Sequence, residues 1–436
     1  MADQPVRLVV HDDLGRSRLT VLLRIILVIP HLIALLLFTV VAFFVAFAGW
    51  FAALALGRLP QGIHRLLAEY VRYATQVDAY IGLVANPYPP MPFSGASHAV
   101  ELEIAPVAPQ RRWTVALRLL LTVPALVISA VIGSWVWSMG GGGPATDTGD
   151  YGGWYWSDYT GGVATAAVIL AWFASLVLGR TPRGLRDFAA YAIGYGAQTW
   201  SYLLLLTDRY PDARPDSHVP PLPPEPHPVR LALGGELRRS RLTVFFRLLL
   251  ALPHLVWLTL WSIAAVLLSI VAWLVTLVLG RNPMLFQRFL GAFVRYQAHV
   301  TAYLLLVGGP FPGFDGRPGV YPVDVTVDHS ERQHRLKTLF RLLLALPALV
   351  LAAAYTGAAW VAAFFGWFAS LVLGRMPAGL AQFGAAALRY DAQTTAYLFF
   401  LTDRYPFASP ALAVEEPEPE PEQLAVFEPG PPEPVH

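Results

Sequence analysis

The 436-residue sequence contains no cysteine and few charged residues. Without cysteine the chain can form no disulfide, thiolate metal site or redox dithiol. Charged residues make up 14% and apolar residues 56% of the chain, and the mean hydropathy is +0.50, whereas a soluble domain is about 25% charged. The 31 basic and 29 acidic residues leave a net charge of only +2, so no large basic field is available for nucleic acid. The composition excludes a soluble globular protein and predicts a membrane protein with no nucleic-acid partner.

One sequence pattern occurs four times along the chain. Each copy has two arginines and a proline at six-residue intervals, then a tryptophan seven residues before Gly-Arg-x-Pro, and then two tyrosines seven residues apart. Fixed spacing of this kind indicates tandem structural repeats. The predicted repeats are residues 5–91, 99–213, 228–314 and 321–409, here called units one to four.

The units also form two similar pairs. Units one and three share Arg-Ser-Arg-Leu-Thr-Val at 16–21 and 239–244, whereas units two and four share Trp-Phe-Ala-Ser-Leu-Val-Leu-Gly-Arg at 172–180 and 367–375. The simplest history is a two-unit ancestor that was duplicated. We therefore expect two homologous halves related by a pseudo-two-fold axis along the membrane normal.

The order Arg-Leu-Leu-Leu, a long apolar stretch, Leu-Gly-Arg-x-Pro, Tyr-x-x-Gln and a closing Leu-Thr-Asp-x-Tyr-Pro resembles the bacterial membrane-protein family known as domain of unknown function 4389. The resemblance covers all four units and implies membrane residence without an established chemistry. Two units depart from the pattern. Unit two has Gly194 where the others have arginine before the first tyrosine, and unit three has His299 where the others have glutamine.

The apolar stretch of unit one, from Leu19 to Leu56, holds one charge, Arg24. As a single helix it would be about 57 Å long, nearly twice the roughly 30 Å hydrocarbon core of a bilayer. Unit two has an extra polar, Gly- and Asp-rich segment at 139–166 in the middle of this stretch, and such a segment is excluded from hydrocarbon. The sequence therefore predicts an all-α membrane protein of four helical hairpins, about eight transmembrane helices, with 139–166 as an extracytoplasmic insertion. In units one and three, which lack a midpoint turn signal, a hairpin that only dips into the bilayer is the alternative.

The charges agree with this topology. In the hairpin arrangement all basic residues lie on one side, whereas the insertion contains three aspartates and no lysine or arginine. We expect a multi-pass protein of the cell (plasma) membrane with both termini in the cytoplasm. The Pro- and Glu-rich tail 414–436 is predicted to be disordered.

Two further elements are expected in each unit. A short β-branched stretch bounded by Pro or Gly predicts a cytoplasmic strand before each unit, and the four strands could pair into one small sheet. The predicted strands are Val6 to Val10, Val100 to Ile104, Val229 to Leu233 and Val323 to Val327. After Gly-Arg-x-Pro comes an amphipathic segment, such as 61–83, that is too polar to span and is expected to be an interfacial helix.

The arginine pairs are the first candidate site. They are compatible with binding of anionic lipid phosphates or an anionic substrate, although positive-inside anchors that pair with acidic loop residues are the simpler interpretation. The candidate lipid- or anion-binding residues are Arg18, Arg24, Arg112, Arg118, Arg241, Arg247, Arg335 and Arg341.

The tyrosine pairs and the residue between them share one helix face at i, i+3 and i+7, so they either line a polar cleft between units or form an aromatic belt. These candidates are Tyr73, Gln76, Tyr80, Tyr195, Gln198, Tyr202, Tyr296, His299, Tyr303, Tyr390, Gln393 and Tyr397.

No catalytic signature accompanies these residues. His31 and His254 follow equivalent prolines and could form a proton or metal site, although a hydrogen-bonded structural histidine is the simpler interpretation. The sequence lacks Gly-x-Ser-x-Gly, a Walker loop and a dinucleotide fingerprint. We therefore expect no enzymatic activity, cofactor or metal. The predicted function is a non-enzymatic protein that organises membrane lipids or partner proteins, and the alternative is a transporter or channel with a path between the repeats.

Overall fold

The computed structural model describes residues 4–133, 162–219, 227–328 and 332–412. Each unit contains one strand, a long apolar helix and a 21-residue helix. Unit one consists of β1 (Val6–Val10), α1 (Arg18–Leu56) and α2 (Gln61–Ile81). Unit two consists of β2 (Val100–Ile104), α3 (Arg112–Ala116), α4 (Arg118–Ile132), α5 (Val163–Leu178) and α6 (Arg183–Leu203), followed by η3 (Pro215–Ser217). Unit three consists of β3 (Val229–Leu233), α7 (Arg241–Phe245), α8 (Arg247–Leu279) and α9 (Met284–Leu304). Unit four consists of β4 (Val323–Val327), α10 (Arg335–Leu339), α11 (Arg341–Leu373) and α12 (Ala378–Leu398).

The predicted hairpins are wrong for units one, three and four. The apolar stretch is one continuous helix, with 39 residues in α1 and 33 residues in each of α8 and α11. The midpoints of α1 and α8 contain no glycine or proline that could end the helix. The midpoint of α11 contains Gly357, and a single glycine is tolerated within a helix. Each helix ends instead at a glycine in the left-handed conformation, such as Gly57 with φ 69°, whose N–H donates to the carbonyl four residues earlier. Among the described residues, three helices are long and apolar enough to cross a membrane, rather than the predicted eight.

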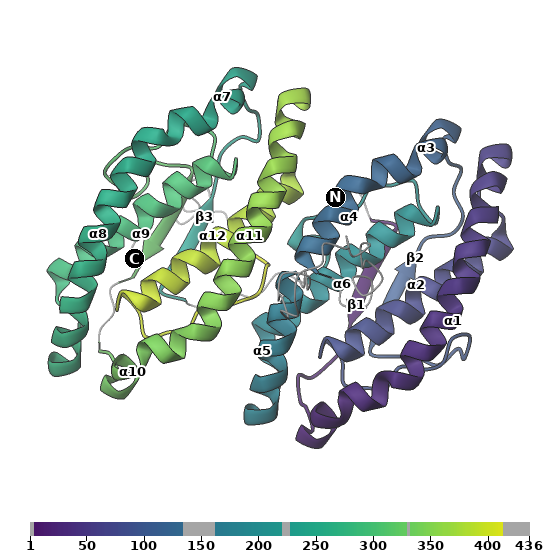
Figure 1. The fold of residues 1–436 in the computed structure, drawn as a ribbon, viewed down its shortest axis with the longest axis horizontal. Helices are drawn as coiled ribbons and strands as arrows, with labels where there is room; N and C mark the ends of the chain where they lie inside the picture. Colours follow the sequence, from purple (N-terminus) through teal and green to yellow (C-terminus); the bar gives the residue numbers. More distant parts are fainter. Residues whose placement is uncertain (1–3, 134–161, 220–226, 329–331, 413–436) are drawn as a thin grey trace, which may run out of the picture.

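Unit two has the same helix in two parts. A methyl group on Gly162 would lie 2.3 Å from the carbonyl oxygen of Val131, so the start of α5 lies against the end of α4. Figure 1 shows α5 following α4 along the molecule rather than folding back on it. The predicted insertion 139–166 therefore interrupts a long helix and is not the turn of a hairpin. Its last residues are helical because α5 begins at Val163, and residues 134–161 lie outside the described part.

All four predicted strands are confirmed at the predicted residues, but they form two sheets rather than one. β1 pairs with β2 and β3 pairs with β4, both antiparallel, so each sheet joins two neighbouring units. Alternation sets the faces: Val6 and Leu8 are buried, whereas Arg7, Glu101 and Glu103 are exposed.

The elements form three layers. The long helices pack on the 21-residue helices α2, α6, α9 and α12, and the strands pack on the opposite side of those helices. The prediction that the 21-residue helices lie at the headgroups is therefore not what the structure shows, because they form the interior layer. Most residues of α6 and α12 are buried. Their polar positions are tolerated there because the strands and the following loops accept and donate hydrogen bonds.

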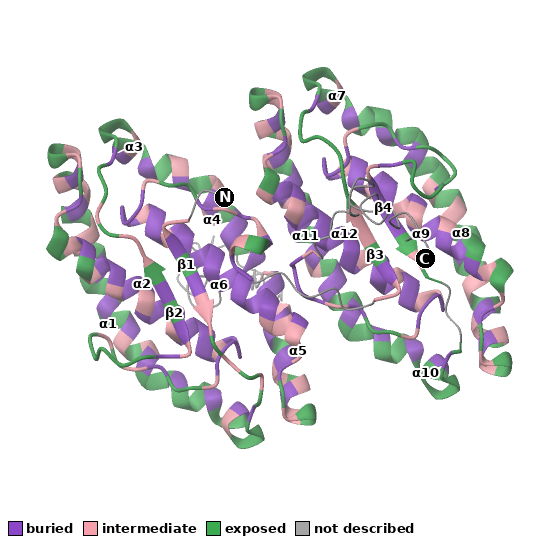
Figure 2. Ribbon diagram, turned by 180° about the vertical axis from the view of Figure 1, so that it is seen from behind, coloured by how far each residue is buried: buried purple, intermediate pink, exposed green. Residues whose placement is uncertain are grey.

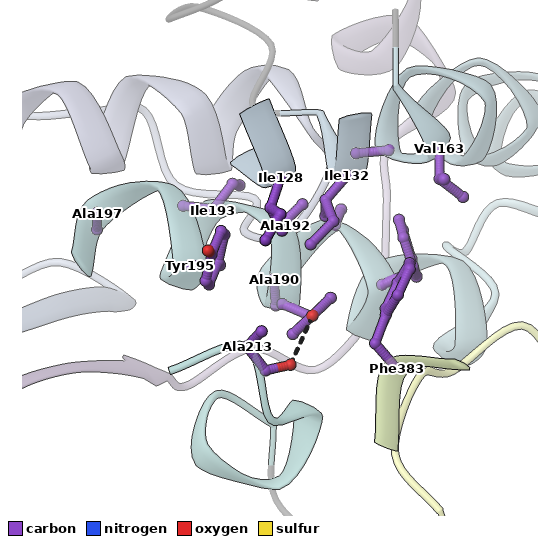
Figure 3. Packing of buried hydrophobic residues seen from close by; sticks show 14 of the residues in the cluster. Ile128, Ile132, Val163, Ala190, Ala192, Ile193, Tyr195, Ala197, Ala213 and Phe383 are labelled. Atoms are coloured by element: carbon purple, nitrogen blue, oxygen red, sulfur yellow. Dashed lines mark hydrogen bonds between the residues drawn. The ribbon is translucent and has the colours of Figure 1, made fainter. Parts of the chain in front are cut away.

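The units are arranged in the spatial order one, two, four, three, and neighbouring long helices run antiparallel (Figure 1). Units two and four meet at the centre, where Phe383 of α12 joins the core around α6 (Figure 3). Equivalent contacts cross this junction in both directions. A methyl group on Gly184 of α6 would lie 2.8 Å from the backbone nitrogen of Ala408, and one on the equivalent Gly379 of α12 would lie 3.0 Å from the backbone nitrogen of Arg214. Such reciprocity indicates a pseudo-two-fold axis perpendicular to the layers.

Candidate anion-binding site

The second arginine of each unit is buried within its own unit. Arg24 donates to the Tyr80 carbonyl at 2.5 Å, and Arg341 donates to the carbonyls of Tyr397 at 2.7 Å and Thr402 at 3.0 Å. Each guanidinium also lies over the second tyrosine of the pair, at 4.0–4.6 Å from the ring centroid. A cation at the carboxyl end of a helix is favoured by the helix dipole, and the ring adds a cation–π contact. These arginines therefore fasten the start of the long helix to the end of the 21-residue helix.

In the part of the chain that the structure describes, only units two and four supply an acidic partner for this arginine. Arg118 lies 3.1 Å from Asp208, and Arg341 lies 2.6 Å from Asp403. In unit one the equivalent contact of Arg24 is the side-chain oxygen of Asn86 at 3.3 Å. In these two units the pairing matches the alternative in which arginines bind acidic loop residues. Lipid binding by the second arginines stays a prediction, and the geometry favours a structural role for them.

The first arginine of each unit is exposed and reaches the partner unit. Arg18 donates to the Val177 carbonyl at 3.0 Å, and Arg112 donates to the Ala55 carbonyl at 3.0 Å. Units three and four exchange the same bonds through Arg241 at 3.0 Å and Arg335 at 2.9 Å. Each bond is made to the last turn of a long helix, where backbone carbonyls have no partner within the helix. The guanidinium groups are exposed to the surroundings.

These contacts bring several exposed arginines together at the ends of the long helices. The backbone bridge between Gly15 and Arg180, together with the bond from Arg18 to the Val177 carbonyl, brings the Gly-Arg segment of unit two to the start of α1. No carboxylate lies within 4.0 Å of any of these arginines in the part of the chain that the structure describes. We call the four groups the rim clusters. Each cluster is defined by backbone and arginine contacts that join two segments at one helix end: Arg18 with Arg180, Arg58 with Arg111 and Arg112, Arg238 with Arg241 and Arg375, and Arg281 with Arg332 and Arg335.

The arginines of the Gly-Arg-x-Pro motif were not among the sequence candidates. Their repetition in all four units was a signal for them, but only the folded chain shows that each lies beside an arginine of the neighbouring unit. The rim clusters therefore depend on the pairing of units, which no local pattern encodes.

The eight tyrosines predicted to line a cleft are instead packed in the interior, each no more than 4% exposed. The residue between each pair contacts a strand. Gln198 donates to the Val6 carbonyl, and Gln393 donates to the Val229 carbonyl, both at 3.0 Å. Gln76 donates to Val100 at 3.4 Å, and His299 bonds Asp324 at 3.0 Å. In every unit the residue at this position binds the strand of the partner unit. This contact indicates a role in joining the two units.

The exceptional glycine of unit two has a structural reason. A methyl group on Gly194 would lie 2.6 Å from Nδ1 of His218. The His218 ring, held by a 2.7 Å bond from Nε2 to the Asp212 carbonyl, therefore occupies the space beside the helix at this position. Burial lowers the pKa of His218, which favours its neutral form.

The two histidines after the prolines belong to different halves and do not form a joint site. His31 bonds the Tyr73 hydroxyl and His254 bonds the Tyr296 hydroxyl, each at 2.8 Å through Nδ1. Both rings are fully buried and contact aromatic side chains. Their geometry fits the structural interpretation.

Comparison with known proteins gives one match. The sequence model of the family described as "Domain of unknown function (DUF4389)" matches residues 18–94, 157–213, 241–312 and 335–409. No curated protein and no solved structure matches the chain. The four matched regions together cover more than half of the sequence and fall on the four units.

Proposed function

The chain belongs to the family of domain of unknown function 4389, in four tandem copies, and on that premise we propose that it is a non-enzymatic protein of the cell membrane that gathers anionic lipids, and through them partner proteins, at the cytoplasmic face. Both termini lie on that face in this proposal. Three helices that are long and apolar enough to cross a membrane support membrane residence.

The rim clusters are the observation that carries this proposal. Their residues are exposed and lie at the ends of the long apolar helices, and among the described residues no carboxylate lies within salt-bridge distance of them. Such positions fall at headgroup level, where each basic residue contributes about 1 kcal/mol to binding of an anionic lipid surface. Two or three arginines in one cluster also match the several oxygens of a lipid phosphate.

The alternative of a transporter or channel requires polar groups around a path between the repeats. No observation on the described residues favours it, since the candidate polar side chains bind strands, helix ends or neighbouring tyrosines.

The test is the lipid that co-purifies with the protein in native-membrane particles. Changing Arg18, Arg112, Arg241 and Arg335 to Gln should lower the anionic fraction of the bound lipid at least several-fold. A matched comparison uses double variants of units one and three. The test variant is Arg18→Gln with Arg241→Gln, and the control variant is Arg7→Gln with Arg230→Gln on the exposed faces of β1 and β3. An unchanged anionic fraction in a folded four-residue variant would return the first arginines to a purely structural role.

A further inference from the structure

The long helices expose apolar side chains along their whole length. On α1, the positions Val21, Val28, Leu35, Ala42 and Gly49 form one buried stripe that runs from end to end of the helix. This regular stripe shows that α1 lies flat on the layer beneath it for its full length. The remaining faces of the helix stay uncovered and are apolar.

The uncovered side of α1 is equally regular. Ile26, Ile33, Val40 and Phe47 repeat every seven residues and are 63%, 56%, 52% and 59% exposed. Most of the other large exposed apolar side chains lie on the long helices of units two, three and four. The three-layer arrangement gathers these helices on one side of the molecule (Figure 1).

The opposite side carries the strands (Figure 2). Its exposed positions include Arg7, Glu101, Glu103 and the ion pair between Arg230 and Asp328. These charged side chains have a high cost of transfer into hydrocarbon. This side of the molecule must face water.

The apolar side and the strand side together restrict the orientations in which the long helices can bind a membrane. At 39 residues α1 is about 58 Å long, against a hydrocarbon core of roughly 30 Å. If α1 stood upright in the bilayer, the layers that lie flat along it would stand beside it, and the charged strands would enter hydrocarbon. The rim clusters at Arg18 and Arg58, at its two ends, would also lie on opposite membrane surfaces.

We infer that the long-helix side of the protein embeds in one leaflet of a membrane with the helix axes parallel to the membrane plane, so that the strand side stays in water on the same side. A helix is about 10 Å thick and half of the hydrocarbon core is about 15 Å, so one leaflet accommodates the layer. All four rim clusters then lie at the same depth, at the headgroups. The pseudo-two-fold axis is then parallel to the membrane normal.

The leaflet fits this surface better than a second copy of the chain. The rim clusters at both ends of the long helices are exposed and have no carboxylate partner in the described ranges, so two such surfaces placed together would bring arginines against arginines. Anionic headgroups complement the same charges. The inference rests on membrane residence from the proposed function, but it concerns orientation and does not depend on which lipid the arginines bind.

The absence of cysteine allows a direct test on the full chain. Single cysteines at Ile26, Ile33, Val40 and Phe47 lie on one helix face over about 31 Å. Each is labelled with the environment-sensitive dye NBD in vesicles of zwitterionic and anionic lipid. Quenching is then measured with lipids that carry nitroxides at shallow and deep positions. The embedded orientation gives four labels of similar depth within one leaflet.

The competing arrangements give other results. An upright helix or a hairpin gives a depth that changes along the series by most of the bilayer thickness, and this overturns the inference while leaving membrane residence intact. Labels that are shielded from water but unaffected by lipid nitroxides indicate a second copy on the surface and also overturn it. Labels that emit as in water contradict both the inference and membrane residence. Cysteines at Ser17 and Arg58 should react with an impermeant reagent from the same side of the membrane.

Discussion

Replacing Arg341 by methionine tests the fastening of the long helix of unit four. The arginine is 1% exposed, donates to two carbonyls at the end of α12, and lies 2.6 Å from Asp403. Methionine fills a similar volume but leaves those acceptors and a partly buried carboxylate without a donor. Breaking a buried charge pair of this kind costs about 3–5 kcal/mol.

Hydrogen exchange in lipid nanodiscs measures this effect locally. Because each 1.36 kcal/mol is a factor of ten, amides at the end of α12 should exchange about 100-fold to several thousand-fold faster in Arg341→Met. Arg335→Met is the matched control, since this exposed residue six positions earlier makes one backbone contact, to Val278 at 2.9 Å. Adding Asp403→Asn to Arg341→Met should restore part of the loss by removing the stranded charge. Equal exchange in the Arg341 and Arg335 variants would refute the structural role given to the buried arginine.

Two smaller effects follow from the same structure. Gly194→Ala should destabilise the fold by about 1–3 kcal/mol because its methyl group would overlap His218. The control Gly291→Ala, which places its methyl group in open space, should be neutral or stabilise the fold by up to about 1 kcal/mol. Thermal unfolding in nanodiscs compares the two variants, and equal losses of stability would contradict the packing at Gly194. Burial lowers the pKa of His227 to about 4. In the unfolded chain His227 binds a proton below about pH 6.5, whereas in the folded chain it stays neutral until about pH 4. The contribution of neutral His227 to the free energy of unfolding is therefore complete above pH 6.5 and falls by up to about 3 kcal/mol as the pH drops toward 4. His227→Asn should reduce this slope, and an identical pH profile would show that other groups cause it.

Local features of the chain were readable from the sequence. All four strands begin and end at the predicted residues because Pro and Gly bound short β-branched runs. The 21-residue helices were recognised as too polar to span, and one was placed within two residues of its end, since α2 runs from Gln61 to Ile81. The repeat and the family were also evident. These features depend on residues close together in the chain.

The hairpin prediction failed because it assigned a membrane orientation to each apolar stretch before its packing was known. A 39-residue apolar helix is longer than the hydrocarbon core is thick, but this excess length matters only if the helix stands upright in the bilayer. The insertion of unit two was taken as the site of a turn, yet α5 starts where α4 ends. The sequence showed the length of the apolar stretches and the uneven distribution of basic residues, but it did not show how the helices pack against the rest of the chain.

The sequence by itself determined the four units, their strands, the glycines that end the long helices and the apolar character that is typical of a membrane protein. Only the tertiary structure decided that units exchange contacts in pairs, since the bonds from Arg18 to Val177 and from Gln198 to Val6 join residues 159 and 192 positions apart. Hydrophobic periodicity fixes which side chains are buried but not what covers them. The layer order, and with it the one-sided apolar surface and the rim clusters, arises only when the units assemble.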